Sequence, residues 1–284
     1  MSTVLFDTPG PSARARHRLM TVVAALLALA VLAWVLWKLW TEDEFEAELW
    51  EDMSQPNIWE AYLKGLIATL KAAASAIVLS IVFGAVFAVA RLSDHAFLRF
   101  PARVVVEFFR AVPLLLLIMF VYYGFGLGLY WSLVIALMLY NGSVLAEVFR
   151  AGILAVPAGQ SEAAMAIGMR KSQVMRLVLL PQSVTIMLPA IISQCVIVLK
   201  DTALGVIVAY RELVGEAQGI AEFVHHSIVP LFVAALIFIA VNYSLSRLAV
   251  YLERRLAKRG RSSVEKLDAR HDPAIDMGAG GSGA

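Results

Sequence analysis

The sequence predicts an all-α integral membrane protein with about six transmembrane helices, and three observations support this. Of its 284 residues, 60% are hydrophobic and only 16% are charged, whereas soluble domains carry about 25% charged residues. The mean hydropathy is +0.76, and apolar stretches recur that approach the about 20 helical residues needed to cross a membrane. Finally, the basic residues gather in alternate connecting segments.

Six apolar stretches are the candidate spans. The third of them carries charge near its start, at Glu107 and Arg110, and Pro113 follows these residues within the span. The spans lie at about 19–40, 65–90, 106–126, 129–149, 184–209 and 227–251.

The first span could be a signal peptide, because three arginines precede it. It is too long for one, however, and it runs into Trp37, Trp40 and an acidic segment without a small-residue cleavage site. We therefore interpret it as a retained anchor.

The orientation follows from the basic residues. If the N-terminus is inside, 18 of the 24 Lys and Arg residues fall in inner segments, and only Lys38, Lys64 and Arg211 fall in outer ones. Because inner loops of membrane proteins are enriched in Lys and Arg, both termini are expected in the cytoplasm. Seven acidic residues and no basic one lie in the segment Glu42–Asp52, which would then be an outer loop. A solvated linker explains this segment more simply than a calcium or partner site.

These observations divide the chain into five parts. Residues 1–18 form a cytoplasmic tail, 19–40 the anchor, and 41–62 the acidic extracytoplasmic loop. Residues 63–252 form a transmembrane domain with five helices, and 253–284 a cytoplasmic tail expected to be disordered, since it ends in small residues. The segment "TPGPSARARHR" near the N-terminus is expected to be disordered too.

Catalytic and metal-binding patterns are missing from the sequence. No G-x-x-x-x-G-K-[ST] pattern encodes a nucleotide site, and the single Cys195 and five scattered histidines have no metal-site spacing. No metal, cofactor or nucleic acid partner is expected. The sequence "GFGLG" at Gly124–Gly128 is interpreted as a tight turn between two spans.

A partly polar loop, "GQSEAAMAIGMRKSQVMRLVLLP", separates the fourth and fifth spans on the predicted cytoplasmic side. Ser161 is expected to cap a short helix, and Gly168 to end it with a left-handed backbone. A second short helix would follow and end at Pro181. Its apolar residues Val174, Met175, Val178 and Leu179 should pack either against a partner or on the lipid surface.

This loop resembles that of the inner-membrane permeases of ATP-binding-cassette (ABC) importers. The family pattern is E-A-A, three residues, Gly, nine residues, Ile, one residue, Leu-Pro. The chain matches it with Val178 in place of the Ile. The matching residues are Glu162, Ala163, Ala164, Gly168, Val178, Leu180 and Pro181. Further stretches between Ile58 and Arg254, including "LPAIISQCVIVLKDTALGVIVAYREL", resemble the branch for polar amino acids, and most closely its actinobacterial glutamate permeases.

The resemblance implies a type I ABC importer permease fold that forms half of a pore in the cell membrane. An ATP-binding subunit would dock on the cytoplasmic coupling loop, and an extracytoplasmic binding protein would deliver the solute. The other half of the pore would be a sister permease or a second copy of this chain. The implied function is ATP-driven import of a polar amino acid, with glutamate expected, by a subunit that is not itself an enzyme.

Charged residues within the fifth span are candidates for the pathway. An ionised group at the bilayer centre costs roughly 2.5–3.5 kcal/mol on insertion scales, so such groups usually face a cavity or a partner. Lys200, Asp201 and Thr202 could line the pathway or gate, or form a buried structural pair. Neighbours on a helix point about 100° apart and cannot face one partner unless the helix is broken there.

Some residues have an alternative role in holding helices together. Glu147 and Arg150 are spaced to pair on one helix face, whereas Asn141, Gln194 and Asn242 could line a pathway or bond neighbouring helices. Two rival functions remain at this point. An ion-gradient-driven secondary transporter would have more buried carboxylates, and a non-transporting membrane scaffold would leave Lys200, Asp201 and Thr202 unexplained.

Overall fold

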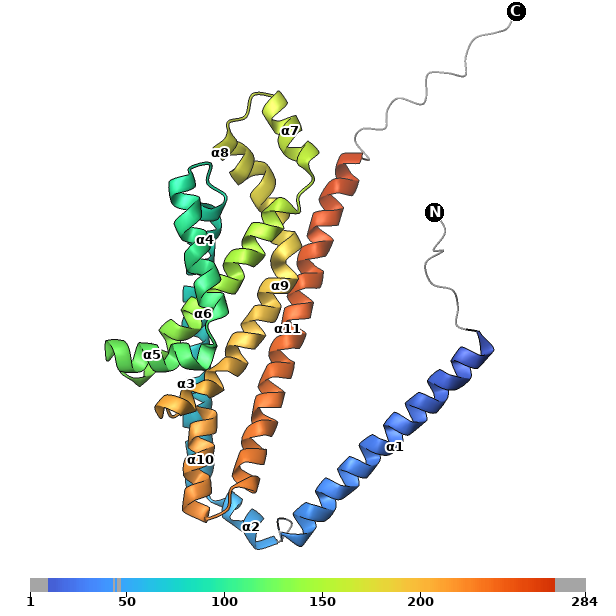
Figure 1. The fold of residues 1–284 in the computed structure, drawn as a ribbon, viewed down its shortest axis with the longest axis vertical. Helices are drawn as coiled ribbons and strands as arrows, with labels where there is room; N and C mark the ends of the chain where they lie inside the picture. The colour runs from blue at the N-terminus through green and yellow to red at the C-terminus, as the bar shows by residue number, and fades with distance from the viewer. Residues whose placement is uncertain (1–9, 43, 45–46, 269–284) are drawn as a thin grey trace, which may run out of the picture.

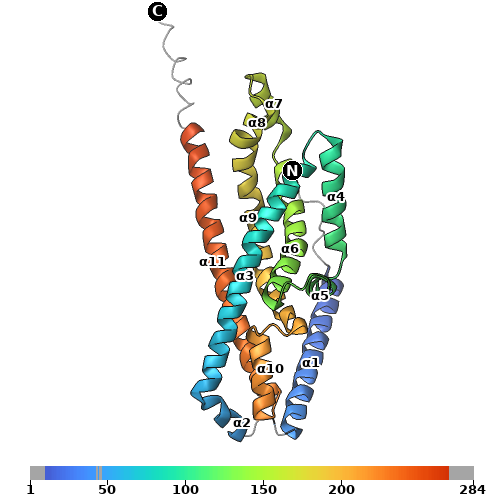
Figure 2. The ribbon, with the colours of Figure 1, turned by 90° about the vertical axis from the view of Figure 1, so that its left-hand side faces the viewer.

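The computed structural model describes residues 10–42, 44 and 47–268, and all regular secondary structure in this part of the chain is helical. The long helices stand roughly side by side, and short ones connect their ends (Figures 1 and 2). The elements are α1 (Pro11–Thr41), α2 (Ala47–Glu51), the 3-10 helix η1 (Asp52–Ser54), α3 (Pro56–Arg91), α4 (Ala96–Ala111), α5 (Leu114–Phe125), α6 (Leu129–Leu154), α7 (Ala158–Ala166), α8 (Lys171–Gln173), the π-helix η2 (Val174–Leu179), α9 (Leu180–Asp201), the 3-10 helix η3 (Thr202–Val208), α10 (Leu213–Val224) and α11 (Ile228–Asp268).

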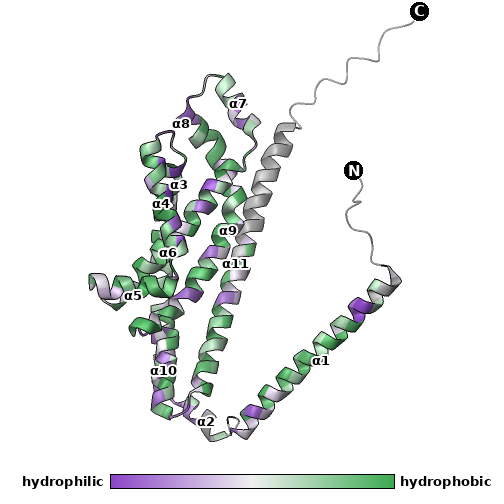
Figure 3. Ribbon diagram, viewed as in Figure 1, coloured by the Kyte–Doolittle hydropathy of each residue, from purple (hydrophilic) through white to green (hydrophobic). Residues whose placement is uncertain are grey.

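Five helices among the described residues are long and apolar enough to cross a membrane, and a sixth crossing is possible if the bent pair α4–α5 counts as one. The expected all-α membrane architecture is therefore confirmed. Apolar residues cover most of α1, α3, α6 and α9, while hydrophilic residues gather around α8 (Figure 3). Because α7 and α10 lie at opposite ends of the molecule (Figure 1), we call these the α7 end and the α10 end.

The third span is not the straight helix expected at 106–126. α4 begins earlier, at Ala96, and α5 leaves it at an angle of 105°. The break falls at Val112 and Pro113 because a residue before proline is pushed into extended backbone, and Val112 has φ −75° and ψ 128°. The predicted turn after this span is confirmed, since Gly126 and Gly128 both have positive φ.

Other helix ends also differ from the expected boundaries. α1 already begins at Pro11, where the fixed φ of proline favours the first turn of a helix, so the segment up to Arg18 is helical. α3 begins at Pro56, within the segment expected to be a loop. α11 continues to Asp268, so the tail is helical to that residue rather than disordered. Residues 269–284 lie outside the described part.

The core forms around α3 and α6, which lie against each other. A Cβ on Gly84 of α3 would lie 2.9 Å from Leu145 Cβ of α6, and a Cβ on Gly142 would lie 2.8 Å from the ring of Phe83. Small residues allow such close approach of membrane helices. The largest apolar cluster involves other residues of α3 and α6, together with α5 and η3, and in it Ile118, Leu133 and Leu137 are fully buried. In contrast, no residue of α1 from Ala15 to Thr41 is buried within the chain.

Candidate functional site

The loop between α6 and α9 forms the α7 end of the molecule. Its first helix, α7, begins at Ala158 after Pro157, and not at Glu162. The expected cap is therefore wrong. Proline fixes the backbone before the helix, and the Ser161 hydroxyl donates instead to the carbonyl of Ala158 at 2.8 Å. Glu162 and Ala163 are exposed on α7, whereas Ala164 is buried.

Gly168 ends α7 with the expected left-handed backbone, at φ +86°. The amide of Met169 donates to the carbonyl of Ala164 at 3.2 Å, and the amide of Gly168 donates to Met165 at 2.9 Å, so the turn satisfies the last carbonyls of the helix. An ideal Cβ at Gly168 would have no heavy atom within 4 Å. Only the backbone, and not crowding within this chain, therefore requires glycine here.

The expected end of the second short helix at Pro181 is wrong. From Lys171 to Asp201 the helix continues through the π-helical turn η2 and the proline into α9. Proline inside a helix removes one backbone donor and crowds the preceding turn. The wider π turn lies immediately before Leu180 and Pro181, and it accommodates both effects.

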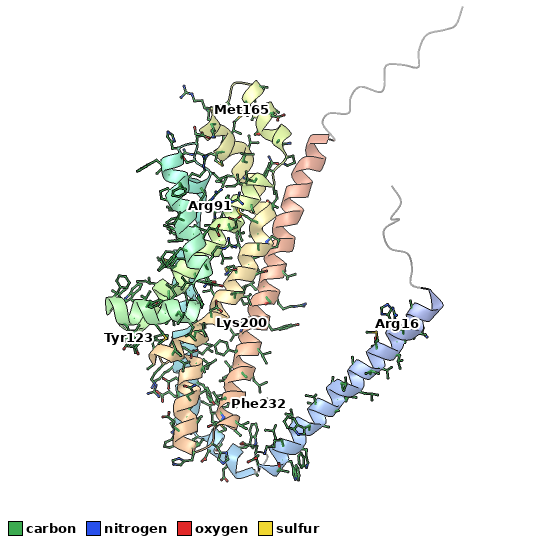
Figure 4. All side chains as sticks on the ribbon, in the orientation of Figure 1. Arg16, Arg91, Tyr123, Met165, Lys200 and Phe232 are labelled. Atoms are coloured by element: carbon green, nitrogen blue, oxygen red, sulfur yellow. The ribbon has the colours of Figure 1, made fainter. Side chains whose placement is uncertain are left out.

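The apolar face of this second helix is covered by the loop itself. Val174 is buried, and Met175, Val178 and Leu179 are half-buried where η2 packs against α7. The apolar side chains left exposed are Met165 (53%) and Ile167 (80%) near the tip of α7, and Leu177 (68%) of η2. Figure 4 shows Met165 at the α7 end of the molecule. The loop is thus a compact pair of helices that presents a small apolar tip and the exposed Leu180 and Pro181.

Lys200, Asp201 and Thr202 point in three directions, as helix geometry predicts for consecutive residues. Lys200 lines a groove of about 600 Å³ between α9 and α11. Asp201 interacts with Asn141 of α6. Thr202 is fully buried, and its hydroxyl donates to the carbonyl of Leu199 at 2.7 Å. The structure does not unwind here, because the α-helix tightens into η3 at Thr202.

The groove is mainly apolar with four polar side chains. Besides Lys200, it is lined by Asn242, Tyr243 and Ser246 of α11, and by apolar residues that include Phe238. The amide nitrogen of Asn242 donates to the carbonyl of Phe238 at 2.8 Å, while its oxygen is buried without a hydrogen-bond partner among the described residues. A cation from one helix and an uncompensated acceptor from another therefore border the same groove. Figure 4 shows Lys200 near the middle of the bundle.

Several other polar residues of the long helices form side-chain hydrogen bonds or ion pairs. Gln194 of α9 donates to the side-chain oxygen of Asn141 at 2.6 Å, and both residues are buried. The predicted Glu147–Arg150 pair is confirmed, with Arg150 Nε 3.2 Å from the carboxylate. Sequence reasoning missed Arg91, whose side chain is only 7% exposed and lies 2.8 Å from Glu147. Its position after a long apolar span was a signal that it could be buried.

Comparison with known proteins supports one family. The family described as binding-protein-dependent transport system inner membrane component matches residues 76–258. The glutamate transport system permease protein GluD of Corynebacterium glutamicum is 40% identical over 244 residues, which cover 82% of this chain and 89% of GluD. The glutamate/aspartate import permease protein GltK of Escherichia coli is 32% identical over 208 residues, which cover 69% of this chain and 93% of GltK.

A solved structure gives the same result. A chain from the crystal structure of an amino acid ABC transporter with histidines is 28% identical, with a TM-score of 0.68, over 72% of this chain and 97% of that chain. The match of the family over most of the chain, the type I importer architecture and the helical loop agree with one another. This chain belongs to the family of binding-protein-dependent transport system inner membrane components.

Proposed function

We propose that this permease subunit forms half of the pore of an ATP-driven importer for glutamate. Three features support the proposal: the kinship with glutamate permeases, the compact loop between α6 and α9, and the groove that contains Lys200. The observation that carries it is the single continuous helix from Lys171 to Asp201, which joins the loop to the groove. At a rise of about 1.5 Å per residue, this helix is roughly 45 Å long.

The α7 end faces the cytoplasm in this proposal. The ends of α3 and α6 and the loop carry Arg91, Arg150, Arg170, Lys171 and Arg176 at this end, and α1 runs away from its arginine-rich first turns towards the α10 end (Figure 1). The excess of basic residues on the inner side of membrane proteins supports this orientation. The acidic segment after α1 would then lie outside the cell.

The partners follow from this orientation. An ATP-binding subunit docks on α7, where Glu162 and Ala163 are exposed beside the apolar Met165 and Ile167. An extracytoplasmic binding protein delivers the amino acid at the α10 end. A sister permease or a second copy of this chain supplies the other half of the pore.

The groove suits an amino acid with an extra carboxylate. The Lys200 ammonium can donate to a carboxylate, and the Tyr243 and Ser246 hydroxyls can accept from an α-ammonium group. We assign Lys200 to the substrate pathway. Asp201 and Thr202 position the helix around it, since Asp201 faces Asn141 and Thr202 is buried in the core.

The proposed mechanism uses α9 as a lever. When two ATP-binding subunits close, they displace α7 and the packed turn η2. Because η2 continues directly into α9, the displacement reaches Lys200 without crossing a flexible joint. Rigid helices that shift relative to one another are an established means of switching between two packed states.

The test is reconstitution of the complex. The tagged chain is purified from its native membrane, the co-purifying subunits are identified by mass spectrometry, and the complex is placed in liposomes with its binding protein. We expect an ATP-binding subunit to co-purify, and glutamate to stimulate both ATP hydrolysis and uptake of labelled glutamate. Uptake driven by an ion gradient without ATP, or a complex that binds partners but transports no amino acid, would contradict the proposal.

A further inference from the structure

A second connection joins the loop to the rest of the bundle at the α7 end. The short link between α3 and α4 lies beside the start of α8, and the ammonium of Lys171 contacts both carboxylate oxygens of Asp94. These residues are 77 positions apart in the sequence, so the contact joins two separate parts of the fold. Along the chain, α8 is connected to α7 on one side and to η2 on the other.

Both sides of this contact are held in place by local hydrogen bonds. On the loop, the amide of Arg170 donates to the side-chain oxygen of Gln173 at 2.8 Å, which fixes the turn that carries Lys171. On the link, the amide of His95 donates to the Ser93 hydroxyl at 3.2 Å. The bond to Lys171 also lowers the pKa of Asp94 below its ordinary value, so this carboxylate is charged at neutral pH.

A group of ion pairs around the buried Arg91 ties three helices together near this exposed pair. Arg91, the last residue of α3, places one guanidinium nitrogen 2.8 Å from Glu147 of α6 and the other 3.4 Å from Glu107 of α4. Arg150 of α6 pairs with the same Glu147. Figure 4 shows Arg91 within the bundle, with Met165 nearer the α7 end. Asp94 therefore lies three residues after Arg91, whose ion pairs are shared by α3, α4 and α6.

We propose that Asp94 is a positioning residue for energy coupling, which gives the loop a second mechanical connection through Lys171 to the α3–α4 link. This inference rests on the proposed function, because it concerns how motion of the loop reaches the pore. The lever α9 moves one side of the pore, and the Asp94–Lys171 pair makes α3 and α4 follow the same displacement. The ion pairs around Arg91 then carry that displacement to α6 as well.

The physical character of the pair fits this role better than a role in stability. Exposed ion pairs contribute little to folding, and both side chains are about two-thirds exposed or more. The pair can nevertheless fix the orientation of two segments that are already folded. Because salt screens exposed charges, its effect must weaken as ionic strength rises.

The test compares charge reversals in the reconstituted complex with its ATP-binding subunit and binding protein. We expect Asp94→Lys and Lys171→Asp each to lower the amount of amino acid transported per ATP hydrolysed about fivefold, the low end of typical coupling energies. The membrane level, the co-purification of the ATP-binding subunit and ATP hydrolysis should persist. The double substitution D94K/K171D should restore the ratio, since it re-forms the pair with its charges exchanged.

Two further measurements sharpen this result. Asp94→Asn removes the charge at nearly constant volume and should also lower the amount of amino acid transported per ATP hydrolysed. High salt should make the values of this variant and of the unsubstituted protein more alike. Glu42→Lys is the matched control, because it breaks the exposed Lys38–Glu42 pair of α1 and should leave the ratio unchanged.

The possible outcomes separate this inference from the proposed function. If the unsubstituted complex does not transport, the proposed function fails. If it does transport and the single reversals leave the ratio unchanged, or the double substitution fails to restore it, the inference is overturned. Loss of folded protein in the single variants that the double variant repairs would show a structural pair only, and would also overturn the coupling role.

Discussion

Gly168 shows at the scale of one residue how the loop depends on backbone geometry. Its φ of +86° closes the turn after α7, and there is open space around it within the chain. A side chain with a Cβ strains a left-handed backbone by roughly 1–2 kcal/mol. Substitutions of Gly168 can therefore separate backbone strain from steric crowding. The strain arises within this chain, whereas any crowding arises from a docked partner.

We predict that Gly168→Val leaves the permease inserted but weakens docking of the ATP-binding subunit and abolishes uptake. Gly168→Ala carries the same kind of strain with less bulk and should be milder. Gly168→Asn is a useful comparison, because asparagine tolerates this backbone better than alanine does. If Asn is milder than Ala, strain dominates, and the reverse order shows that fit to the partner dominates. The measurements are co-purification and uptake in vesicles, and normal values for the Val variant would rule out the loop as coupling element.

Lys200 is the second residue whose role can be isolated. Hydrogen bonds to charged groups contribute about 1.5–3 kcal/mol, so Lys200→Met should raise the KM for glutamate by roughly tenfold or more while the membrane level stays constant. Lys71→Met is the control, because Lys71 lies over the ring of Tyr130 and does not line the groove. An unchanged KM in the Lys200 variant, or an equal effect in both variants, would remove Lys200 from the pathway.

At the scale of elements, ion pairs join the ends of α3, α4 and α6. The Arg91 guanidinium is nearly inaccessible to solvent and contacts carboxylates from two other helices. Removing one partner of a buried pair leaves an uncompensated charge and is costly, whereas removing both can be close to neutral. The burial of Arg91 therefore predicts that loss of its carboxylate partner destabilises the protein.

We expect Glu147→Gln to lower the free energy of unfolding by about 2 kcal/mol, below the usual range for fully buried pairs because Glu147 is 27% exposed. The double variant R91M/E147Q should recover part of this loss. Thermal unfolding of the purified protein in detergent measures both effects. Additive losses in the double variant would mean that the two side chains stabilise the bundle independently.

For the whole molecule, the helices imply one arrangement across the membrane. α1, α4 and α9 run towards the α10 end, and α3, α6 and α11 run back towards the α7 end (Figures 1 and 2). An even number of crossings then leaves the start of α1 and the end of α11 on the side of the loop. The bent α4–α5 pair has to count as one crossing for this to hold.

A reporter placed after Asp268 should therefore be cytoplasmic, and an epitope inserted within Glu42–Asp52 should be accessible to antibody from outside intact cells. An epitope inserted at Gly159, in the exposed first turn of α7, should behave like the C-terminal reporter. Should the acidic segment and the C-terminal reporter label from one side, the topology and the assignment of the loop would both be wrong.

The sequence by itself determined the features that depend on local chemistry. Apolar stretches located the long helices, the spacing around Glu162 and Gly168 located the loop, and the distance from Glu147 to Arg150 predicted their pairing on one helix face. Each of these features depends on residues within a few turns of one another. At that range, helical geometry and the backbone preferences of glycine are sufficient to predict them.

Only the tertiary structure decided the rest. The chain bends at Pro113, whereas the helix continues through Pro181, where a π turn precedes the proline. Arg91 with Glu147, Asn141 with Gln194, and Asp94 with Lys171 are each brought together from distant positions by packing of α3, α6 and α9. Lys200 borders a groove because α11 lies opposite it, and local sequence carries no information about which distant helix that is.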